Sequence, residues 1–512
     1  MTARLAGPLL LLALWQGLAL LTAGRFLIAG PAEVAAWLAD QSGLVLRALA
    51  VTGRNAAVGF VAGNLAAVLL AALAALWPRS RGGVLALALV VHCLPLVATG
   101  PILRVLLGPG EGPQIWIAAL AVYYTTLIPL LAGLSATPSG WLDLVRVHGR
   151  GRLAQLVHVR ARAALPYLLA GLQIAVPAAL LGAMVGEFTG AERGLGVLTI
   201  RFTRALDVPA LWGVATVAAG VALAGYGAIG ALGRRLGAPP PPVILSLGAA
   251  PRAPWRRQAG GALLVLLAVP LLWWAAIEAL ALNPFFVKTP AELWLALTSA
   301  PDSALRRATL AGAGLQTLAF LLPGYLAGLA LGAGLAALLA LAPAAGQVVT
   351  PLALAMRAIP IITTAPLIVL ALGRGAAGTV AIVAVMVFFP TLVACRYGLA
   401  QAPGRIMDLM QCHAAGPWAR LRHVQLPAML PALFASARMA VPAAVLAVTV
   451  AEWLATGRGL GQLMALSASV SDYTMLWLCV ALVTLASAAG YAAIAVLERR
   501  VLAVFAPEQL VR

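Results

Sequence analysis

The residues that could do chemistry gather in two polar segments of an otherwise apolar chain. Residues 143–162 read DLVRVHGRGRLAQLVHVRAR, and residues 408–427 read DLMQCHAAGPWARLRHVQLP. Each segment contains one Asp, two His and at least two Arg, which are groups that bind metals, phosphates or acidic partners. The His spacings match no metal site, so histidines on the surface or in packing contacts are expected instead. The likeness of the two segments predicts a shared role.

Nucleotide hydrolysis is not expected from this chain. Its only lysine, Lys288, follows NPFFV, with no glycine-rich loop ahead of it. A phosphate-binding loop needs both the glycines and the lysine. The four cysteines, Cys93, Cys395, Cys412 and Cys479, lie far apart and form no CxxC pair. This argues against a disulfide framework or a zinc site, and no cofactor is predicted.

Five ionisable residues lie within or at the ends of long apolar stretches and are candidates to line a polar pathway between them. They are His92, Arg357, Glu187, Glu452 and Arg438. A charge deep in a membrane costs about 2.5–3.5 kcal/mol on insertion scales, so it normally faces a cavity or a partner. Arg357 could attract an anion, or it could reach the interface or a backbone carbonyl. Glu187 and Glu452 could form a gate or a receptor contact, but a hydrogen bond to the following glycine turn is favoured.

The elements that position these residues are membrane helices. The chain has 512 residues, of which 63% are hydrophobic and 10% are charged. Its mean hydropathy is +1.00. Uncharged runs of about 20 residues or more can cross the hydrocarbon core as helices. They are residues 5–24, 55–78, 112–142, 163–186, 208–233, 258–277, 308–356, 375–395 and 473–497.

The net charge of +19 would suggest nucleic acid in a soluble protein. Here the arginines cluster between apolar runs, as in the cytoplasmic loops of membrane proteins. No aromatic residues are interleaved to stack on bases, so no nucleic-acid partner is expected. Lipid is the expected surrounding.

An internal repeat runs through the chain. Pro95 aligns with Pro360, 265 positions later, and the same offset aligns other prolines, charges and glycines. The aligned pairs include Pro101 and Pro366, Asp143 and Asp408, His148 and His413, His158 and His423, Glu187 and Glu452, and Gly196 and Gly461. Arg357 aligns with His92, and Arg438 with Gln173, so a pathway between the copies would be asymmetric. Near the start the offset becomes 259, and Trp15 meets Trp274.

Each copy is predicted to contain six spans, which gives about 12 transmembrane helices in an all-α fold. The first copy's spans are 5–23, 53–77, 84–106, 114–135, 165–188 and 210–232. The second copy's spans are 261–281, 310–341, 348–371, 376–398, 428–451 and 474–497. Because six spans return the chain to its starting side, the copies are parallel repeats. The predicted domains are residues 1–233 and 262–512, joined by a Pro- and Arg-rich cytoplasmic linker at 234–261.

The two polar segments then fall in cytoplasmic loops, 137–165 (loop 1) and 401–427 (loop 2), and both chain termini are also cytoplasmic. The apolar spacing in each loop predicts two short helices joined by a turn. Asp143 and Asp408 are expected to cap a loop helix or to pair with a nearby Arg rather than to contact a partner directly. Prolines 95, 101, 360 and 366 are expected to break or bend the third spans.

The loops resemble the "EAA" coupling motif of ABC-importer permeases, with Asp in place of Glu. The motif positions are Asp143, Gly149 and Val159 in loop 1, and Asp408, Ala414, Val424, Leu426 and Pro427 in loop 2. In loop 1 Ala161 and Arg162 stand where the motif has Leu-Pro, and in loop 2 Ala414 stands where it has Gly.

The flanking segments are similar to the nitrate, sulfonate and taurine branch of these permeases. They are RAIPIITTAPLIVLALGRG at 357–375, LPAMLPALFASARMAVPAAVLAVTVAEWLATGRGLGQLM at 426–464, and ERRVL at 498–502. The resemblance implies two permease domains fused in one chain of a bacterial inner membrane. It implies two separate ATPase subunits at the cytoplasmic loops and a solute-binding protein outside. It also implies a small solute, either an anion such as nitrate, sulfonate or taurine, or a pyrimidine vitamin precursor.

Two other functions are alternatives to this one. A secondary transporter with parallel repeats, driven by an ion gradient, would need acidic ion sites in the membrane centre, and the chain has few acidic residues there. It would also leave the paired loops unexplained. A membrane enzyme would need a catalytic cluster near one interface, whereas Glu187 and Glu452 are single and related by the repeat.

Overall fold

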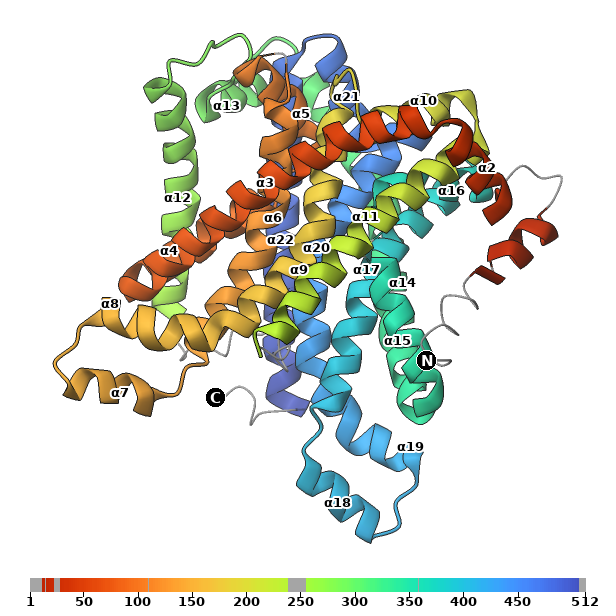
Figure 1. Cartoon of the computed structure of the whole chain (residues 1–512). Coiled ribbons are helices and arrows are strands. Elements are labelled where there is room, and N and C mark those ends of the chain that lie inside the picture. Colours follow the sequence, from red (N-terminus) through yellow and green to blue (C-terminus); the bar gives the residue numbers. More distant parts are fainter. Residues whose placement is uncertain are drawn as a thin grey trace.

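The computed structural model describes residues 12–13, 15–22, 28–108, 110–237, 255–357 and 359–505. Within these ranges the chain is built of helices and turns, with no strand. Eight helices are long and apolar enough to cross a membrane, and a bent helix pair can be counted as a ninth. The predicted all-α membrane fold with a duplicated bundle is therefore confirmed (Figure 1).

The two copies contain the same helices in the same order. The first copy has α3 (Ser42–Leu76), α4 (Arg81–His92), α5 (Leu96–Leu107), α6 (Gly112–Ser135), α9 (Ala161–Glu187), α10 (Leu195–Ala205) and α11 (Val208–Arg235). The second has α14 (Ser303–Leu341), α15 (Pro343–Arg357), α16 (Ile361–Leu372), α17 (Ala376–Ala400), α20 (Leu426–Ala451), α21 (Gly459–Ser469) and α22 (Tyr473–Phe505). The helix α2 (Pro31–Asp40) precedes α3, and α12 (Trp255–Ala279) and α13 (Pro290–Thr298) precede α14.

Four of the twelve predicted spans do not correspond to one of the eight long helices. The predicted span 5–23 lies partly outside the described residues, which here are 12–13 and 15–22. The predicted span 261–281 falls in α12. The predicted third spans, 84–106 and 348–371, are each divided into two shorter helices. The remaining eight predicted spans correspond to the eight long helices.

Prolines explain the division of the third spans. The helices α4 and α5 meet at a bend of 92°, and Pro95 stands directly before α5. Pro360 stands in the same way directly before α16. Proline lacks a backbone N–H and disfavours helical geometry in the residue before it, so a helix ends at that point. Pro101 and Pro366 lie inside α5 and α16 without dividing them.

Glycines bring the second and fourth spans of each copy into close contact. A Cβ atom on Gly63 would lie 2.5 Å from the Ala119 carbonyl oxygen, and a Cβ atom on Gly328 would lie 2.6 Å from the Ala384 carbonyl oxygen. Small residues of this kind let membrane helices approach backbone to backbone, where dispersion contacts hold them together. Both pairs stand 265 residues apart, so the repeat preserves the packing as well as the sequence.

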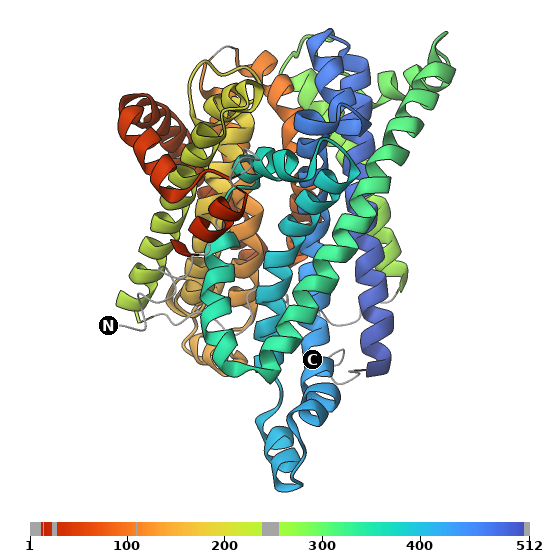
Figure 2. The same ribbon diagram turned by 90° about the vertical axis from the view of Figure 1, so that its right-hand side faces the viewer.

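The two copies are parallel. The short helices α7 (Ser139–Val147) and α8 (Arg152–Gln155) of the first copy project from the same end of the bundle as α18 (Gly404–Cys412) and α19 (Pro417–Arg420) of the second (Figure 1). Figure 2, turned by 90°, shows the second pair projecting beyond the same end. This end is called the loop end below.

One apolar core joins the copies. Met184 and Leu195 of the first copy belong to the same buried cluster as Ile362, Leu367 and Val450 of the second. The fused chain therefore packs as one bundle.

Candidate functional site

Loops 1 and 2 have the same local structure. Loop 1 contains α7 and α8 and enters α9 through the π-helical turn η2 (Leu156–Arg160). Loop 2 contains α18 and α19 and enters α20 through the π-helical turn η3 (Leu421–Gln425). The predicted pair of short helices joined by a turn is confirmed in both. The π-helical turns were not predicted; they are rare and often mark functional positions.

A residue with left-handed backbone geometry ends the first helix of each loop. Gly149 has φ of 70°, and Ala414, at the matching position, has φ of 54°. The N–H of the next residue, Arg150, donates to the Val145 carbonyl at 3.2 Å, and loop 2 repeats this bond at 2.9 Å. Glycine adopts this geometry freely, whereas a residue with a Cβ atom pays about 1–2 kcal/mol. The motif glycine therefore meets a backbone requirement, and Ala414 meets it under strain.

The expectation that Asp143 and Asp408 cap loop helices is wrong. The residues before α7 and α18 are Pro138 and Pro403, and both Asp residues lie inside the helices. Asp143 instead forms the expected pair with an arginine, Arg146, at 3.0 Å. Both of these side chains are exposed, so the pair contributes little to stability. Asp408 is exposed.

Each loop exposes an apolar face at matching positions. The loop 1 face consists of Trp141, Leu144, Val147 and Leu153, and the loop 2 face consists of Ile406, Leu409, Cys412 and Trp418. Leu144 is 61% exposed and Leu409 is 57% exposed. Apolar side chains gathered on a projecting loop are typical of a surface that binds another protein. The chain therefore presents two such surfaces from the loop end.

The remaining motif residues attach the loops to the bundle. Val424 is buried and Val159 is half-buried, each in the π-helical turn that leads into a span. Leu426 begins α20, and Pro427 follows it in the first turn, where proline fits a helix. Loop 1 has a contact of its own, because Arg152 donates to the Leu76 carbonyl at the end of α3 at 3.2 Å. A displacement of either loop would thus reach the spans directly.

Glu187 and Glu452 accept hydrogen bonds from the glycine turns that follow the fifth spans. The Gly196 N–H donates to Glu187 Oε2 at 2.6 Å, and the Gly461 N–H donates to Glu452 Oε2 at 2.7 Å. Both side chains are buried. Of the two interpretations drawn from the sequence, the favoured hydrogen bond is present. A gating or receptor-contact role stays a prediction.

Two threonines complete these turns and were missed in the sequence. The Thr52 hydroxyl donates to Glu187 Oε1 at 2.6 Å and accepts the Leu195 N–H at 2.8 Å. Thr317, at the matching position in α14, accepts the Leu460 N–H at 2.9 Å. The repeat could have pointed to these two threonines, since they stand 265 residues apart and so occupy the same position in the two copies. In the first copy the Thr52–Glu187 bond therefore ties the fifth span to the second span, and in the second copy Thr317 ties the second span to the turn that follows the fifth span.

His92 and Arg357 stand directly before the division of the third span in their copies. His92 is the last residue of α4, and Arg357 is the last residue of α15. The His92 ring stacks on Tyr124 with centroids 4.1 Å apart. The pathway role of His92 and Arg357 stays a prediction.

Arg438 has an acidic partner that was missed in the sequence. Its guanidinium forms an ion pair with Glu498 of α22 and lies 5.9 Å from the centroid of the Tyr491 ring. In the first copy Gln173 occupies this position, and its amide donates to the Tyr226 carbonyl at 3.3 Å. The pair neutralises the charge of Arg438 inside the bundle, and any pathway role for Arg438 stays a prediction.

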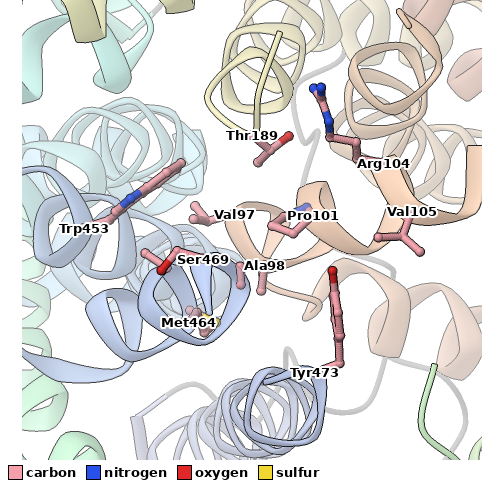
Figure 3. A pocket seen from close by; sticks show the side chains of 12 residues that line it. Val97, Ala98, Pro101, Arg104, Val105, Thr189, Trp453, Met464, Ser469 and Tyr473 are labelled. Carbon is pink, nitrogen blue, oxygen red and sulfur yellow. The ribbon is translucent and has the colours of Figure 1, made fainter. Parts of the chain in front are cut away.

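A cavity of about 560 Å³ lies between the copies, at the end opposite the loops. The first copy contributes Val97, Ala98, Pro101, Arg104, Val105 and Thr189, and the second contributes Trp453, Met464, Ala465, Ala468, Ser469 and Tyr473. Figure 3 shows Trp453, Arg104 and Tyr473 on different sides, with Pro101 and Ala98 between them. Sequence reasoning missed this cavity, because its walls come from residues that are not at matching positions in the two copies.

Comparison with known proteins finds one family model that matches both copies and several relatives that match part of the chain. The model of the family described as "binding-protein-dependent transport system inner membrane component" matches residues 63–237 and again residues 324–503. A probable ABC transporter permease protein of Haemophilus influenzae is 30% identical over 231 residues, which are 44% of this chain and 94% of the relative. No solved structure matches the chain significantly.

Two further relatives have names that state a solute. The formylaminopyrimidine transport permease protein ThiX of Halalkalibacterium halodurans is 26% identical over 43% of this chain and 89% of the relative. The riboflavin transport system permease protein RibX of Chloroflexus aurantiacus is 29% identical over 30% of this chain and 57% of the relative.

Proposed function

We propose a function from one premise: the chain belongs to the family of binding-protein-dependent transport system inner membrane components and contains the family's domain twice. It is a multi-pass permease subunit of an ABC transporter. We infer that both halves of the translocation pathway are supplied by this one polypeptide, with residues 1–233 as the first permease domain, 234–261 as the linker and 262–512 as the second.

The observation that carries the proposal is the pair of matching apolar faces on loops 1 and 2. Two equal surfaces at one end of a duplicated bundle suit two equal partners. The partners that the family implies at this place are ATPase subunits, one on each loop. ATP hydrolysis belongs to those subunits, because Lys288 is the chain's only lysine and no glycine-rich phosphate loop precedes it.

The coupling we propose is mechanical. Closure of two ATPase subunits on ATP moves the two loops together. The π-helical turns and the buried Val424 connect loop 2 to α20, and the Arg152 bond connects loop 1 to α3. The rigid spans pass this displacement to the opposite end, where the pathway opens and closes to solute.

We infer the orientation from the charges. Arginines in the loops and in the linker support a loop end and two termini in the cytoplasm of a bacterial cell. The end opposite the loops then meets a solute-binding protein outside the inner membrane.

We propose a flat heteroaromatic solute of the vitamin or vitamin-precursor type. Two relatives are named for riboflavin and for a formylaminopyrimidine, and both solutes are flat heterocycles. The anions suggested by sequence resemblance (nitrate, sulfonate or taurine) are the second candidate class. The observation that favours an anion is Arg104, whose guanidinium lines the cavity between the copies.

A capture experiment with loop variants tests the proposed function. The Leu144→Arg and Leu409→Arg variants each place a charge on one exposed apolar face. We expect either variant to weaken capture of the ATPase subunit from its own host's membranes, and both together to reduce capture and ATP-driven uptake at least ten-fold. Gln411→Arg is the matched control, because it adds the same charge to an exposed, already polar position of α18.

Two results would overturn the proposal. The first is uptake by the purified chain in vesicles without any ATPase, driven by an imposed ion gradient, which would favour the secondary-transporter alternative. The second is full ATPase capture by the doubly substituted loops.

A further inference from the structure

The repeat makes the place of this cavity equivalent to a second place in the bundle, and the two places have different linings. The repeat would place a matching cavity where α16 meets α10 and α11. At that place the chain has Val369 instead of Arg104, Leu454 instead of Thr189 and Val208 instead of Tyr473. Val208, Leu370 and Leu454 belong to the apolar clusters that pack this region. The two places therefore differ in both polarity and packing.

Side-chain size also differs between the two places. Ile200 stands in place of Ala465 and Leu370 in place of Val105, and both are packed against the core that joins the copies. Ile200 also lines the second cavity described below, so the second place is not filled throughout. A protein built from two identical chains could not differ in this way, whereas a fused chain can have two different linings.

The walls of the cavity suit a flat ring with polar atoms at its edge. Trp453 and Tyr473 offer aromatic faces on different sides, while Val97 and Ala98 are buried and apolar. Arg104 donates one N–H to the Gly190 carbonyl, which holds its guanidinium in place. A guanidinium has five N–H donors, so others remain for a ligand. The hydroxyls of Thr189 and Ser469 add further polar groups.

The volume also bears on the solute class. A water molecule takes about 30 Å³ of liquid, and a small inorganic anion is of similar order. The cavity of about 560 Å³ is within the usual range for sites that enclose an organic ligand, roughly 300–1,000 Å³. A nitrate ion would leave most of it filled with water.

We propose that this cavity is a solute-binding site within the permease itself, for a flat heteroaromatic solute with hydrogen-bond acceptors along one edge. Trp453 and Tyr473 stack against the ring, and Arg104 binds the acceptor edge. The inference rests on the proposed function and deepens it, because it gives the permease a selectivity of its own beside that of the binding protein. Since both copies line this one cavity, it holds one solute molecule per chain.

A second cavity of about 550 Å³ provides the control. It is lined by residues of the first copy alone, among them Arg201 and Arg204. Arg204 stands at the position that matches Ser469 of the proposed site. Arg204→Gln therefore removes an arginine from a cavity of similar size that does not lie between the copies.

Binding to the purified full chain in lipid nanodiscs, without partners, tests the inference. The probes are riboflavin and a formylaminopyrimidine, with nitrate and taurine as the anionic arm, measured by titration calorimetry. We expect at least one heteroaromatic probe to bind with one molecule per chain. Arg104→Gln and Tyr473→Leu should each weaken its affinity at least ten-fold, and Arg204→Gln less than two-fold. Trp453→Phe should bind better than Trp453→Leu, since phenylalanine keeps an aromatic face.

The outcomes separate this inference from the proposed function. No binding of either heteroaromatic probe, two molecules bound per chain, full affinity in Arg104→Gln, or binding of the anions alone would each overturn the inference. Thermal unfolding of every variant shows whether lost binding reflects lost folding, and Tyr473→Leu gives an independent reading if Arg104→Gln unfolds. ATP-driven uptake that persists in Arg104→Gln at an unchanged KM would leave the permease function standing and remove the site.

Discussion

Phe188 and Trp453 occupy the same position in the two copies, and their rings touch. The centroids lie 5.5 Å apart with the planes at 70°, which is an edge-to-face contact. Two residues related by the repeat can meet only close to the axis that relates the copies. The ends of the two fifth spans that lie opposite the loop end are therefore in contact on this axis, and the structure is closed between them at this point.

Cross-linking this pair should stop transport. We expect the Phe188→Cys, Trp453→Cys double variant, joined by a short bifunctional thiol reagent, to lose at least ten-fold in ATP-driven uptake, because solute entry requires the outer ends to separate. The variant should carry Cys412→Ser, since Cys412 is the exposed native cysteine among the described residues. Each single-cysteine variant treated with the same reagent is the control. Undiminished uptake by the cross-linked protein would show that these ends do not part.

Cys412 reports the orientation of the loop end without any engineering. It is exposed on loop 2, whereas Cys93, Cys395 and Cys479 are buried. A membrane-impermeant maleimide should therefore label the unmodified chain in inside-out vesicles and leave it unlabelled in intact spheroplasts, with Cys412→Ser unlabelled in both. Labelling in spheroplasts would place loop 2 outside the cell and contradict the proposed topology.

The left-handed turns of the loops predict opposite effects for two reciprocal substitutions. Ala414→Gly should stabilise loop 2 by removing strain of about 1–2 kcal/mol, and Gly149→Ala should cost loop 1 a similar amount. Susceptibility of each loop to limited proteolysis in nanodiscs measures this directly. Equal protection of the wild type and both variants would mean that the strain is relieved elsewhere.

The glycine turns that follow the fifth spans, at the end opposite the loops, leave no room for a side chain. A Cβ atom on Gly461 would lie 2.2 Å from the Thr449 carbonyl oxygen. We expect Gly461→Ala to lower the midpoint of thermal unfolding clearly. Gly220→Ala is the control, because Gly220 lies in an exposed part of α11 with nothing within 4 Å. That substitution should be neutral or stabilising by up to about 1 kcal/mol.

The ion pair between Arg438 and Glu498 should show strong coupling in a double-mutant cycle. Removing one partner leaves a charge without its counterion inside the bundle, which typically costs about 3–5 kcal/mol. We expect Arg438→Gln and Glu498→Gln to be destabilised singly and the double variant to regain most of the loss, measured by thermal unfolding. Arg438→Gln also reproduces the residue of the first copy, Gln173. Additive effects of the two single changes would show that the pair does not interact.

Much of the fold could be predicted from the sequence because the repeat shows each pattern of apolar and polar residues twice. The offset of 265 residues aligned the spans, the loops and the prolines at 95 and 360, and composition alone marked the membrane class. Helix boundaries were less accurate: α3 begins at Ser42, well before the predicted residue 53, because its first turns continue beyond the uncharged run. Charge-free runs mark the part of a helix in lipid, and helices extend past it.

The site was harder to predict, for two physical reasons. Contacts between distant spans, such as Arg438 with Glu498 or Thr52 with Glu187, depend on three-dimensional packing that helical periodicity does not specify. The cavity depends on differences between the copies, and the alignment of the repeat draws attention to what is shared. Asp143 and Asp408 were expected to cap a loop helix or to pair with an arginine; Pro138 and Pro403 stand directly before the helices, so capping is ruled out, and Asp143 forms the pair.

The distance in sequence between Arg438 and Glu498 has a consequence for how the protein is made. The two residues are 60 positions apart, and a ribosome adds about 5–20 residues per second. Arg438 is thus synthesised roughly 3–12 s before its counterion. During that interval the nascent chain carries a cation without its partner on a helix destined for lipid. The ion pair that offsets the cost of this charge in the bilayer is therefore complete only after the last helix has been made.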